Sequence, residues 1–140
     1  MPLNKEKYKA LITDLGENVR LVAVSKTKSV EEIRALYDLG QRDFGENYVQ
    51  ELMEKKAALP ADIRWHFIGH LQSNKAKLII PFVHLIQGVD SIKLLKEINK
   101  QAERIARKAD VLLQVHIAEE EETKFGFDEK ELNEVQDQLT

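Results

Sequence analysis

The chain has 140 residues, no cysteine, and a formal net charge of −3 from 21 basic and 24 acidic residues. This length predicts a single domain over residues 1–140, and the balanced charge provides no bulk attraction to nucleic acid. The absence of cysteine excludes disulfides, thiolate nucleophiles and cysteine-based zinc sites, and it agrees with a reducing cytoplasm. No apolar run reaches membrane-spanning length. We therefore expect a cytoplasmic protein with no membrane contact.

The first elements along the chain are predicted to be a helix and then a strand. Apolar residues within 8–15 recur at helical spacing, and Gly16 is placed to end that helix. This segment is polar and amphipathic, which is not typical of a signal peptide. Residues 21–24, LVAV, indicate a strand buried on both faces. Ser29 and Glu32 then form a capping-box pattern that begins a second helix.

Four more strand candidates follow, each with a helix after it. The strands are expected in DFGEN (43–47), WHFIGH (65–70), VHLIQGVD (83–90) and DVLLQVHI (110–117), the last one buried on both faces. The helices are expected to begin at an Asn47–Gln50 capping box, at Ser73 (ending before Pro81), at Ser91, and at an Asp128–Glu131 capping box. The helix after Ser91 carries an apolar stripe from Ile92 through Ile105 to Ala109.

This alternation predicts an α/β fold of about five strand–helix units preceded by an N-terminal helix. Near-continuous apolar strands between helices are typical of a parallel sheet. Both a doubly wound open sheet and a (β/α) barrel have this order, and the order of elements alone does not separate them.

Ligands of parallel α/β folds bind at the carboxyl ends of the strands, where the loops converge. The residues expected around that mouth are Lys26, Glu46, Asn47, His70, Gln72, Ser73, Asn74, Asp90 and Glu119. Lys26 attracts attention because it directly follows an apolar strand. Desolvation there would lower the pKa of its ammonium group and make a neutral amine available to attack a carbonyl. The alternatives are an ion pair with Glu46 or a side chain that extends into solvent.

Other polar groups favour structural interpretations. The turn at residues 70–74 is more typical of helix capping than of anion binding. The histidines lack zinc-site spacing, so no metal site is predicted, and glutamates 119–122 are typical of a solvated turn. Basic residues recur every three or four positions on the helix after Ser91, which predicts a solvent face and leaves nucleic-acid or acidic-lipid contact as the alternative. They are Lys93, Lys96, Lys100, Arg104 and Arg107.

Four separated blocks resemble the pyridoxal phosphate (PLP) homeostasis family, in the order that the family has them. They are LVAVSKTKSVEEI (21–33), GQRDFGENYVQE (40–51), WHFIGHLQSNKAK (65–77) and KFGF (124–127). The resemblance implies a TIM-type barrel of the alanine racemase N-terminal type. It further implies that PLP is held as a Schiff base on Lys26, with Asn47 and His66 lining the surroundings of the cofactor ring. No catalytic residue is carried over, since the family implies little turnover.

Family members are longer than this chain, which is expected to supply the N-terminal part of a (β/α)₈ barrel without the segments that hold the PLP phosphate. Uncovered strands would then favour self-association. The leading hypothesis is a PLP-binding protein that acts in PLP (vitamin B6) and amino-acid homeostasis, with PLP-dependent enzymes as client partners. The alternative is a PLP-dependent alanine racemase that uses Lys26 and a second base, for which Tyr48 is the tyrosine next to the pocket. A third hypothesis is a cofactor-free module that binds nucleic acid through Lys96 and Lys100.

Overall fold

Strands and helices alternate along the chain, as the sequence predicts. The computed structural model describes residues 4–115, 130, 131, 133 and 134. The strands are β1 (Ala23–Val24), β2 (Asp43–Glu46), β3 (Arg64–Phe67), β4 (Leu85–Val89) and β5 (Val111–Leu113). The helices are α1 (Lys5–Leu15), α2 (Val30–Asp38), α3 (Val49–Ala58), the short 3₁₀ helix η1 (Ser73–Lys75), α4 (Ala76–Ile79) and α5 (Ile92–Arg104).

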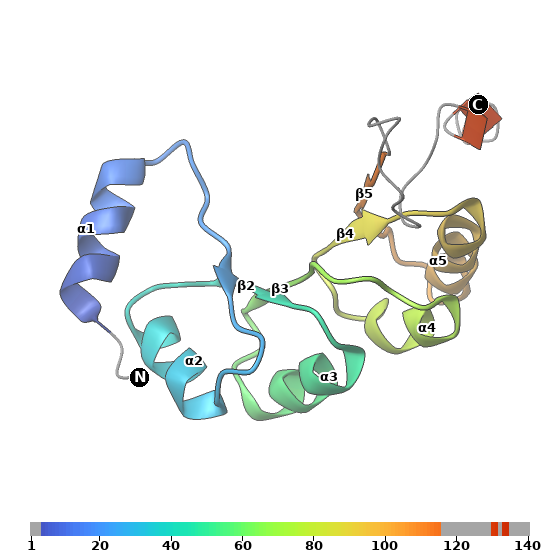
Figure 1. Cartoon of the computed structure of the whole chain (residues 1–140). Coiled ribbons are helices and arrows are strands. Elements are labelled where there is room, and N and C mark those ends of the chain that lie inside the picture. The colour runs from blue at the N-terminus through green and yellow to red at the C-terminus, as the bar shows by residue number, and fades with distance from the viewer. Residues whose placement is uncertain (1–3, 116–129, 132, 135–140) are drawn as a thin grey trace.

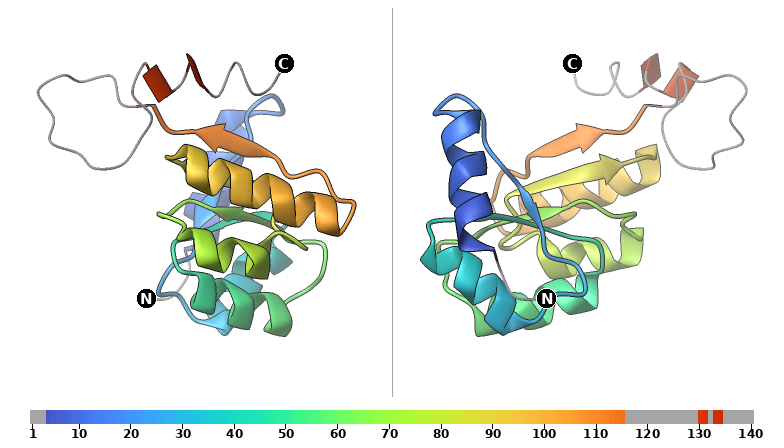
Figure 2. Two further views of the ribbon diagram at one scale, coloured as in Figure 1. Left: turned by 90° about the vertical axis from the view of Figure 1, so that its right-hand side faces the viewer. Right: turned by 60° about the vertical axis from the view of Figure 1, so that its left-hand side comes forward.

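The five strands form one parallel sheet in chain order, β1-β2-β3-β4-β5. Helices α2 to α5 lie along one face of this sheet (Figure 1), and the turned views agree (Figure 2). A doubly wound sheet reverses its strand order and carries helices on both faces, whereas a (β/α) barrel keeps consecutive order with the helices outside. The consecutive strand order, with the helices on one face, therefore excludes the doubly wound sheet, and the prediction of a partial barrel is confirmed.

The core lies between the sheet and helices α2 to α5. Ala23, Phe44 and Trp65 are register partners in adjacent strands, so their side chains share the face that meets the helices. The rings of Phe44 and Trp65 have centroids 5.9 Å apart. Two residues further along, Phe67 and Ile86 pair on the same face and are fully buried. Burial of these apolar side chains is the main force that holds the helices against the sheet.

The two edge strands are shorter and more open than the sequence indicates. The prediction of burial on both faces is wrong for β1, where Val24 is 54% exposed, and for β5, where Leu112 is 50% exposed. Each strand pairs on one side only, and no described element covers the sheet face opposite the helices. Side chains alternate between faces, so every second residue of these strands stays open.

Helix starts show which capping signals were reliable. In α2 the capping box is confirmed: Ser29 Oγ accepts from the Glu32 N–H and Glu32 Oε1 accepts from the Ser29 N–H, both at 3.1 Å. The Asn47–Gln50 capping box is wrong, because the N-cap of α3 is Tyr48 and makes no side-chain cap bond. The turn at residues 70–74 likewise provides no side-chain cap for η1 or α4.

Helix α5 begins as expected and ends early. Ser91 Oγ accepts from the Leu94 N–H at 3.1 Å. The predicted apolar stripe is wrong at its end, since the helix stops at Arg104 and Ile105 is 48% exposed. The cause is a closing turn in which Ala106 has a positive φ of 53° and the Arg107 N–H donates to the Ala102 carbonyl. This is the left-handed C-terminal motif that ordinarily uses glycine.

Helix α1 lies beyond the β1 edge of the sheet (Figure 1). Gly16, with a positive φ of 74°, ends it as predicted. The helix buries none of its residues, and Leu11 and Ile12 are exposed, while the Tyr8 hydroxyl donates to Gln41 Oε1 at 2.6 Å.

Among the described helices, none has the length and hydropathy needed to cross a bilayer. Three predicted features lie outside the described residues: the cap at Asp128, the run 119–122 and the KFGF block.

Candidate functional site

Lys26 lies in the turn between β1 and α2. The residue is exposed, and its side chain makes no hydrogen bond or ion pair with the part of the chain that the structure describes. The expectation of an amine desolvated among apolar strand residues is therefore wrong, because β1 is an edge strand with one open face. The ion pair with Glu46 is not formed either. Lys26 presents its amine to solvent at the carboxyl end of the first strand.

A buried network of charged groups holds the backbone on both sides of Lys26. Lys55 Nζ, from α3, donates to the Ser25 carbonyl at 2.6 Å, to Glu46 Oε2 at 2.8 Å and to Glu51 Oε1 at 2.6 Å. The Ser25 hydroxyl also donates to Glu46 Oε2. Glu51 Oε1 accepts from the Thr27 N–H at 2.5 Å. Glu46 was expected at the mouth, but it points to the helix face and is fully buried.

The protonation of the two carboxylates depends on the same ammonium group. Burial raises the pKa of Glu46, while the hydrogen bonds from Lys55 and Ser25 oppose that rise. The hydrogen bond from Lys55 is the main reason that the pKa of Glu51 is lowered. Glu46 Oε1 is buried and has no hydrogen-bond partner among the described residues. The charged form of Glu46 therefore relies on contacts made by its other oxygen.

Asn47 lines a groove of about 470 Å³ at the carboxyl ends of β2 and β3, together with Tyr48, Gly69 and His70. A Cβ on Gly69 would lie 2.5 Å from the Asn47 carbonyl oxygen, so only glycine permits this close approach of the two loops. The approach fixes the Asn47 backbone against its neighbour, and the chain stays extended through Tyr48, with φ −125° and ψ 131°, before α3 begins. Neither Lys26 nor His66 lines this groove.

His66 is a buried member of a polar network on the inner face of the sheet, which is the face opposite the helices. Its Nε2 lies 3.0 Å from Asp43 Oδ1, and its Nδ1 lies 3.2 Å from the Gln87 amide nitrogen. Arg64 donates to both oxygens of Asp43, at 2.9 and 2.7 Å. Burial would raise the pKa of Asp43, but the hydrogen bonds from Arg64 and His66 outweigh burial and lower it. Both ring nitrogens of His66 therefore have a polar partner, as in a histidine with a structural role in the core.

The sheet register shows how the three predicted residues are placed relative to one another. Val24, Gly45 and His66 are partners in one row across β1, β2 and β3. Lys26 and Asn47 each follow that row by two residues, so both come after the last residue of their strands, β1 and β2. Lys26 and Asn47 therefore lie at the carboxyl ends of their strands, and His66 lies within β3.

Further along the mouth, His70 Nδ1 lies 2.8 Å from Asp90 Oδ2, which joins the ends of β3 and β4. Asp90 is buried and His70 is exposed. Both residues were expected near the mouth, and the structure pairs them directly.

One group in the described part of the chain brings three possible metal donors within 4.8 Å of one another: Asp43, His66 and His84. Burial lowers the pKa of His84. The Arg64 guanidinium already contacts both oxygens of Asp43, and its positive charge opposes a dication at the same place. These contacts explain the group as a hydrogen-bonded network.

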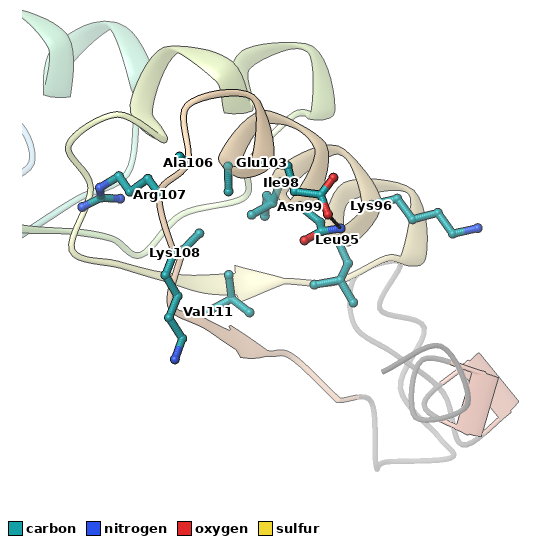
Figure 3. A pocket seen from close by; sticks show the side chains of 11 residues that line it. Leu95, Lys96, Ile98, Asn99, Glu103, Ala106, Arg107, Lys108 and Val111 are labelled. Atoms are coloured by element: carbon teal, nitrogen blue, oxygen red, sulfur yellow. Dashed lines mark hydrogen bonds between the residues drawn. The ribbon is translucent and has the colours of Figure 1, made fainter. Parts of the chain in front are cut away.

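A larger groove, of about 680 Å³, lies between α5 and the segment that leads into β5 (Figure 3). Ile98 and Val111 contribute apolar surface there, and Lys96 and Lys108 lie at its rim (Figure 3). It is at the end of the sheet opposite the mouth, which does not favour it as the cofactor site.

Arg107 does not belong to the solvent-exposed basic stripe that was predicted. Its guanidinium donates to two backbone carbonyls, of Ile80 and Val83, at 2.8 Å each.

The family described as alanine racemase, N-terminal domain, matches residues 4–140. The chain belongs to this family. Its relatives include the curated pyridoxal phosphate homeostasis protein of Synechocystis, 40% identical over 127 residues that cover 89% of this chain and 58% of the relative. The human protein of the same name is 44% identical over 117 residues, which cover 77% of this chain and 42% of the relative. The chain thus spans about half the length of the curated relatives it matches.

Solved structures agree with this alanine racemase N-terminal family fold. PipY of Synechococcus elongatus, solved without PLP, is 37% identical with a TM-score of 0.87, over 96% of this chain and 63% of that one. The same protein with PLP bound has a TM-score of 0.85 at 37% identity. Alanine racemase of Bartonella henselae, solved with covalently bound PLP, has a TM-score of 0.77 at 18% identity, over 97% of this chain and 38% of that one, and shows the fold alone.

Two residues of this family member fit groups of PLP. A Schiff base with the PLP aldehyde forms from a primary amine, and Lys26 offers one that is exposed at a strand end. The side-chain amide of Asn47 can both donate and accept, as a polar ring substituent requires. Of the network around Lys26, the sequence analysis named Glu46 but missed Lys55 and Glu51.

Proposed function

We propose that this chain binds PLP through a Schiff base to Lys26 and acts in PLP and amino-acid homeostasis in the cytoplasm. The observation that carries the proposal is the exposed amine of Lys26 at the carboxyl end of β1, in a chain 37% identical to a protein solved with PLP bound. When bound, PLP supplies an electron-withdrawing ring and an aldehyde that reacts with amines. The contribution of the chain is to hold one amine at the mouth of the sheet.

The proposed site combines Lys26 with Asn47, which follow the last residues of the neighbouring strands β1 and β2. Asn47 lines the groove between the β2 and β3 loops, where its amide can hold a polar group of the ring and orient it. Contact between His66 and the cofactor remains a prediction. The partners of His66 in this structure support a role in keeping the inner face of the sheet ordered below the site.

The experiment that tests this function is trapping with a reducing agent. The purified chain is incubated with PLP, reduced with borohydride and digested, and mass spectrometry locates the pyridoxyl group. We expect labelling concentrated on Lys26, with the exposed neighbour Lys28 as an internal reference, and loss of that label in Lys26→Ala. Equal labelling of the surface lysines would contradict a dedicated site.

A racemase remains the second candidate because Tyr48, 61% exposed, lines the groove beside Asn47. The other two tyrosines donate to partners elsewhere, Tyr8 to Gln41 and Tyr37 to Asp62. Incubation of the PLP-loaded chain with D- and L-alanine separates the two functions. Turnover that disappears in both Lys26→Ala and Tyr48→Phe would favour the racemase, and no turnover would favour the binding protein.

Self-association and PLP-dependent client enzymes are also proposed. The exposed side chains of Val24 and Leu112, on the two edge strands, support self-association. Sedimentation velocity over a range of concentrations tests it, and we expect Val24→Ser to reduce the associated fraction. A chain that stays monomeric at all concentrations would contradict it. Transfer of PLP to an apo-enzyme, followed by recovery of that enzyme's activity, tests the client role.

A further inference from the structure

The turn that carries Lys26 has an unusual backbone. Its ends are joined by a hydrogen bond from the Lys28 N–H to the Ser25 carbonyl, at 3.1 Å. Between them, Thr27 has a positive φ of 63°. A β-branched residue rarely adopts this left-handed conformation, which persists only where surrounding contacts enforce it. The conformation next to Lys26 is therefore imposed from outside the turn.

The enforcing contacts come from β2 and α3 and reach both neighbours of Lys26. On one side, Lys55 Nζ donates to the Ser25 carbonyl and Glu46 accepts from the Ser25 hydroxyl. On the other side, Glu51 accepts from the Thr27 N–H. The side chain of Lys55 is 6% exposed and that of Glu46 is fully buried, so water does not compete for the bonds on the Ser25 side, whereas the bond from Thr27 to Glu51 is exposed.

These three charged groups depend on one another. The single ammonium of Lys55 contacts both carboxylates, and within the described residues Glu46 forms no other ion pair. Loss of Lys55 would leave two carboxylates close together without their shared cation and would free the Ser25 carbonyl from α3. The network therefore works as one unit, and a change in any member reaches the backbone on either side of Lys26.

We propose that Lys55, Glu46 and Glu51 are positioning residues that hold the Ser25–Thr27 backbone so that the Lys26 side chain leaves the turn in one fixed direction. The proposal rests on the proposed function only in the use of that amine, since the network itself acts on the PLP-free chain. Its role is to make Lys26 chemically distinct from Lys28, which is also exposed but has these contacts on one side only, through Thr27.

The test measures lysine reactivity without the cofactor. Trace acetylation of the PLP-free chain, read by mass spectrometry over a range of pH, gives the reactivity of Lys26 relative to Lys28. We expect a ratio away from unity in the unmodified chain and a ratio near unity in Lys55→Met and Glu51→Ala. Glu51→Gln keeps an oxygen that can accept from the Thr27 N–H, so it should retain most of the original ratio. Lys56→Met and Glu54→Ala, on exposed positions of the same helix, are the matched controls.

Far-ultraviolet circular dichroism shows which variants are folded. If Lys55→Met does not fold, Glu51→Ala decides, because the Glu51 side chain is 25% exposed and its loss is less disruptive. A folded Glu51→Ala with the original ratio would overturn the proposal, as would a ratio of unity in the unmodified chain. PLP trapping is then run on the same variants, and we expect the Lys26 label to fall about tenfold in Glu51→Ala, in line with the cost of misplacing a reacting group. Trapping on other lysines with an unchanged acetylation result would refute the proposed function and leave the positioning network in place.

Discussion

Lys55→Met should destabilise the chain strongly. The side chains of Lys55 and Glu46 are 6% and 0% exposed, and their charged atoms are 2.8 Å apart. Removal of one member of a buried ion pair typically costs about 3–5 kcal/mol, because the remaining charge stays buried without its partner. We expect the free energy of unfolding to fall by about that amount at neutral pH. Glu51 and the Ser25 carbonyl also lose a donor, which places the effect toward the upper end.

The pH dependence of this loss has a definite sign. Burial already raises the pKa of Glu46, and without the opposing ammonium it should rise further. The folded variant then holds a proton that the unfolded chain releases, so its stability decreases as the pH rises from the unfolded to the folded pKa. The deficit relative to the unmodified chain should therefore be smaller in mildly acidic buffer than at neutral pH.

Urea unfolding followed by the fluorescence of Trp65 measures the effect, since this single tryptophan is 3% exposed on β3. Lys56→Met removes an exposed charge from the same helix and should change stability little. The double variant Glu46→Gln, Lys55→Met removes both charges and should recover part of the loss. A loss below about 1 kcal/mol in Lys55→Met, or a double variant no more stable than the single one, would refute this reasoning.

Three further predictions concern other contacts. Gly69→Ala would put a Cβ 2.5 Å from the Asn47 carbonyl oxygen, so we expect the free energy of unfolding to fall by about 1–3 kcal/mol. The Asn47 amide signals in NMR spectra should also shift, and unchanged spectra would contradict this prediction. The pKa of Asp43 is lower in the folded chain than its ordinary value, so Asp43 should contribute stability at pH values above its unfolded pKa. This contribution should be lost as the pH falls through the folded pKa. A titration of the Asp43 carboxyl at or above its ordinary pKa would contradict this prediction. Arg107→Ala removes the donor to two carbonyl oxygens between α4 and β4 and should lower the free energy of unfolding in urea by about 1–3 kcal/mol. The control, Lys108→Ala, should lower it little. Equal losses in the two variants would contradict the assigned contacts.

The features that sequence analysis predicted correctly depend on short-range interactions. The alternation of strands and helices follows from local hydrophobic spacing, and the Ser29 capping box closes within four residues. The Asn47 cap failed because Gly69, in the loop after β3, decides where that backbone lies. The burial of β1 and β5 failed for a similar reason, since a strand's pattern does not reveal whether it lies at an edge.

The network around Lys26 was only partly accessible from sequence. Lys55 follows the fully buried Leu52 by three residues on α3, so a charged side chain in the apolar stripe was a signal that a partner had to be present. Glu51 gave no such signal, because its contact with Thr27 spans 24 residues of sequence. Lys26 itself was identified through the family resemblance, and its exposure in the structure shows that burial was not a valid argument for it.

The consecutive strand order also bears on how the chain acquires its structure. Ala23 pairs with Phe44, Asp43 with Arg64, and His66 with Leu85, so each new strand closes a loop of only about 20 residues. No strand of the described sheet has to wait for a distant segment. Folding can therefore proceed during synthesis from the N-terminus, with each unit adding to the edge left by the one before it. The turn that holds Lys26 would be fixed as soon as α3 has formed, well before the later strands emerge from the ribosome.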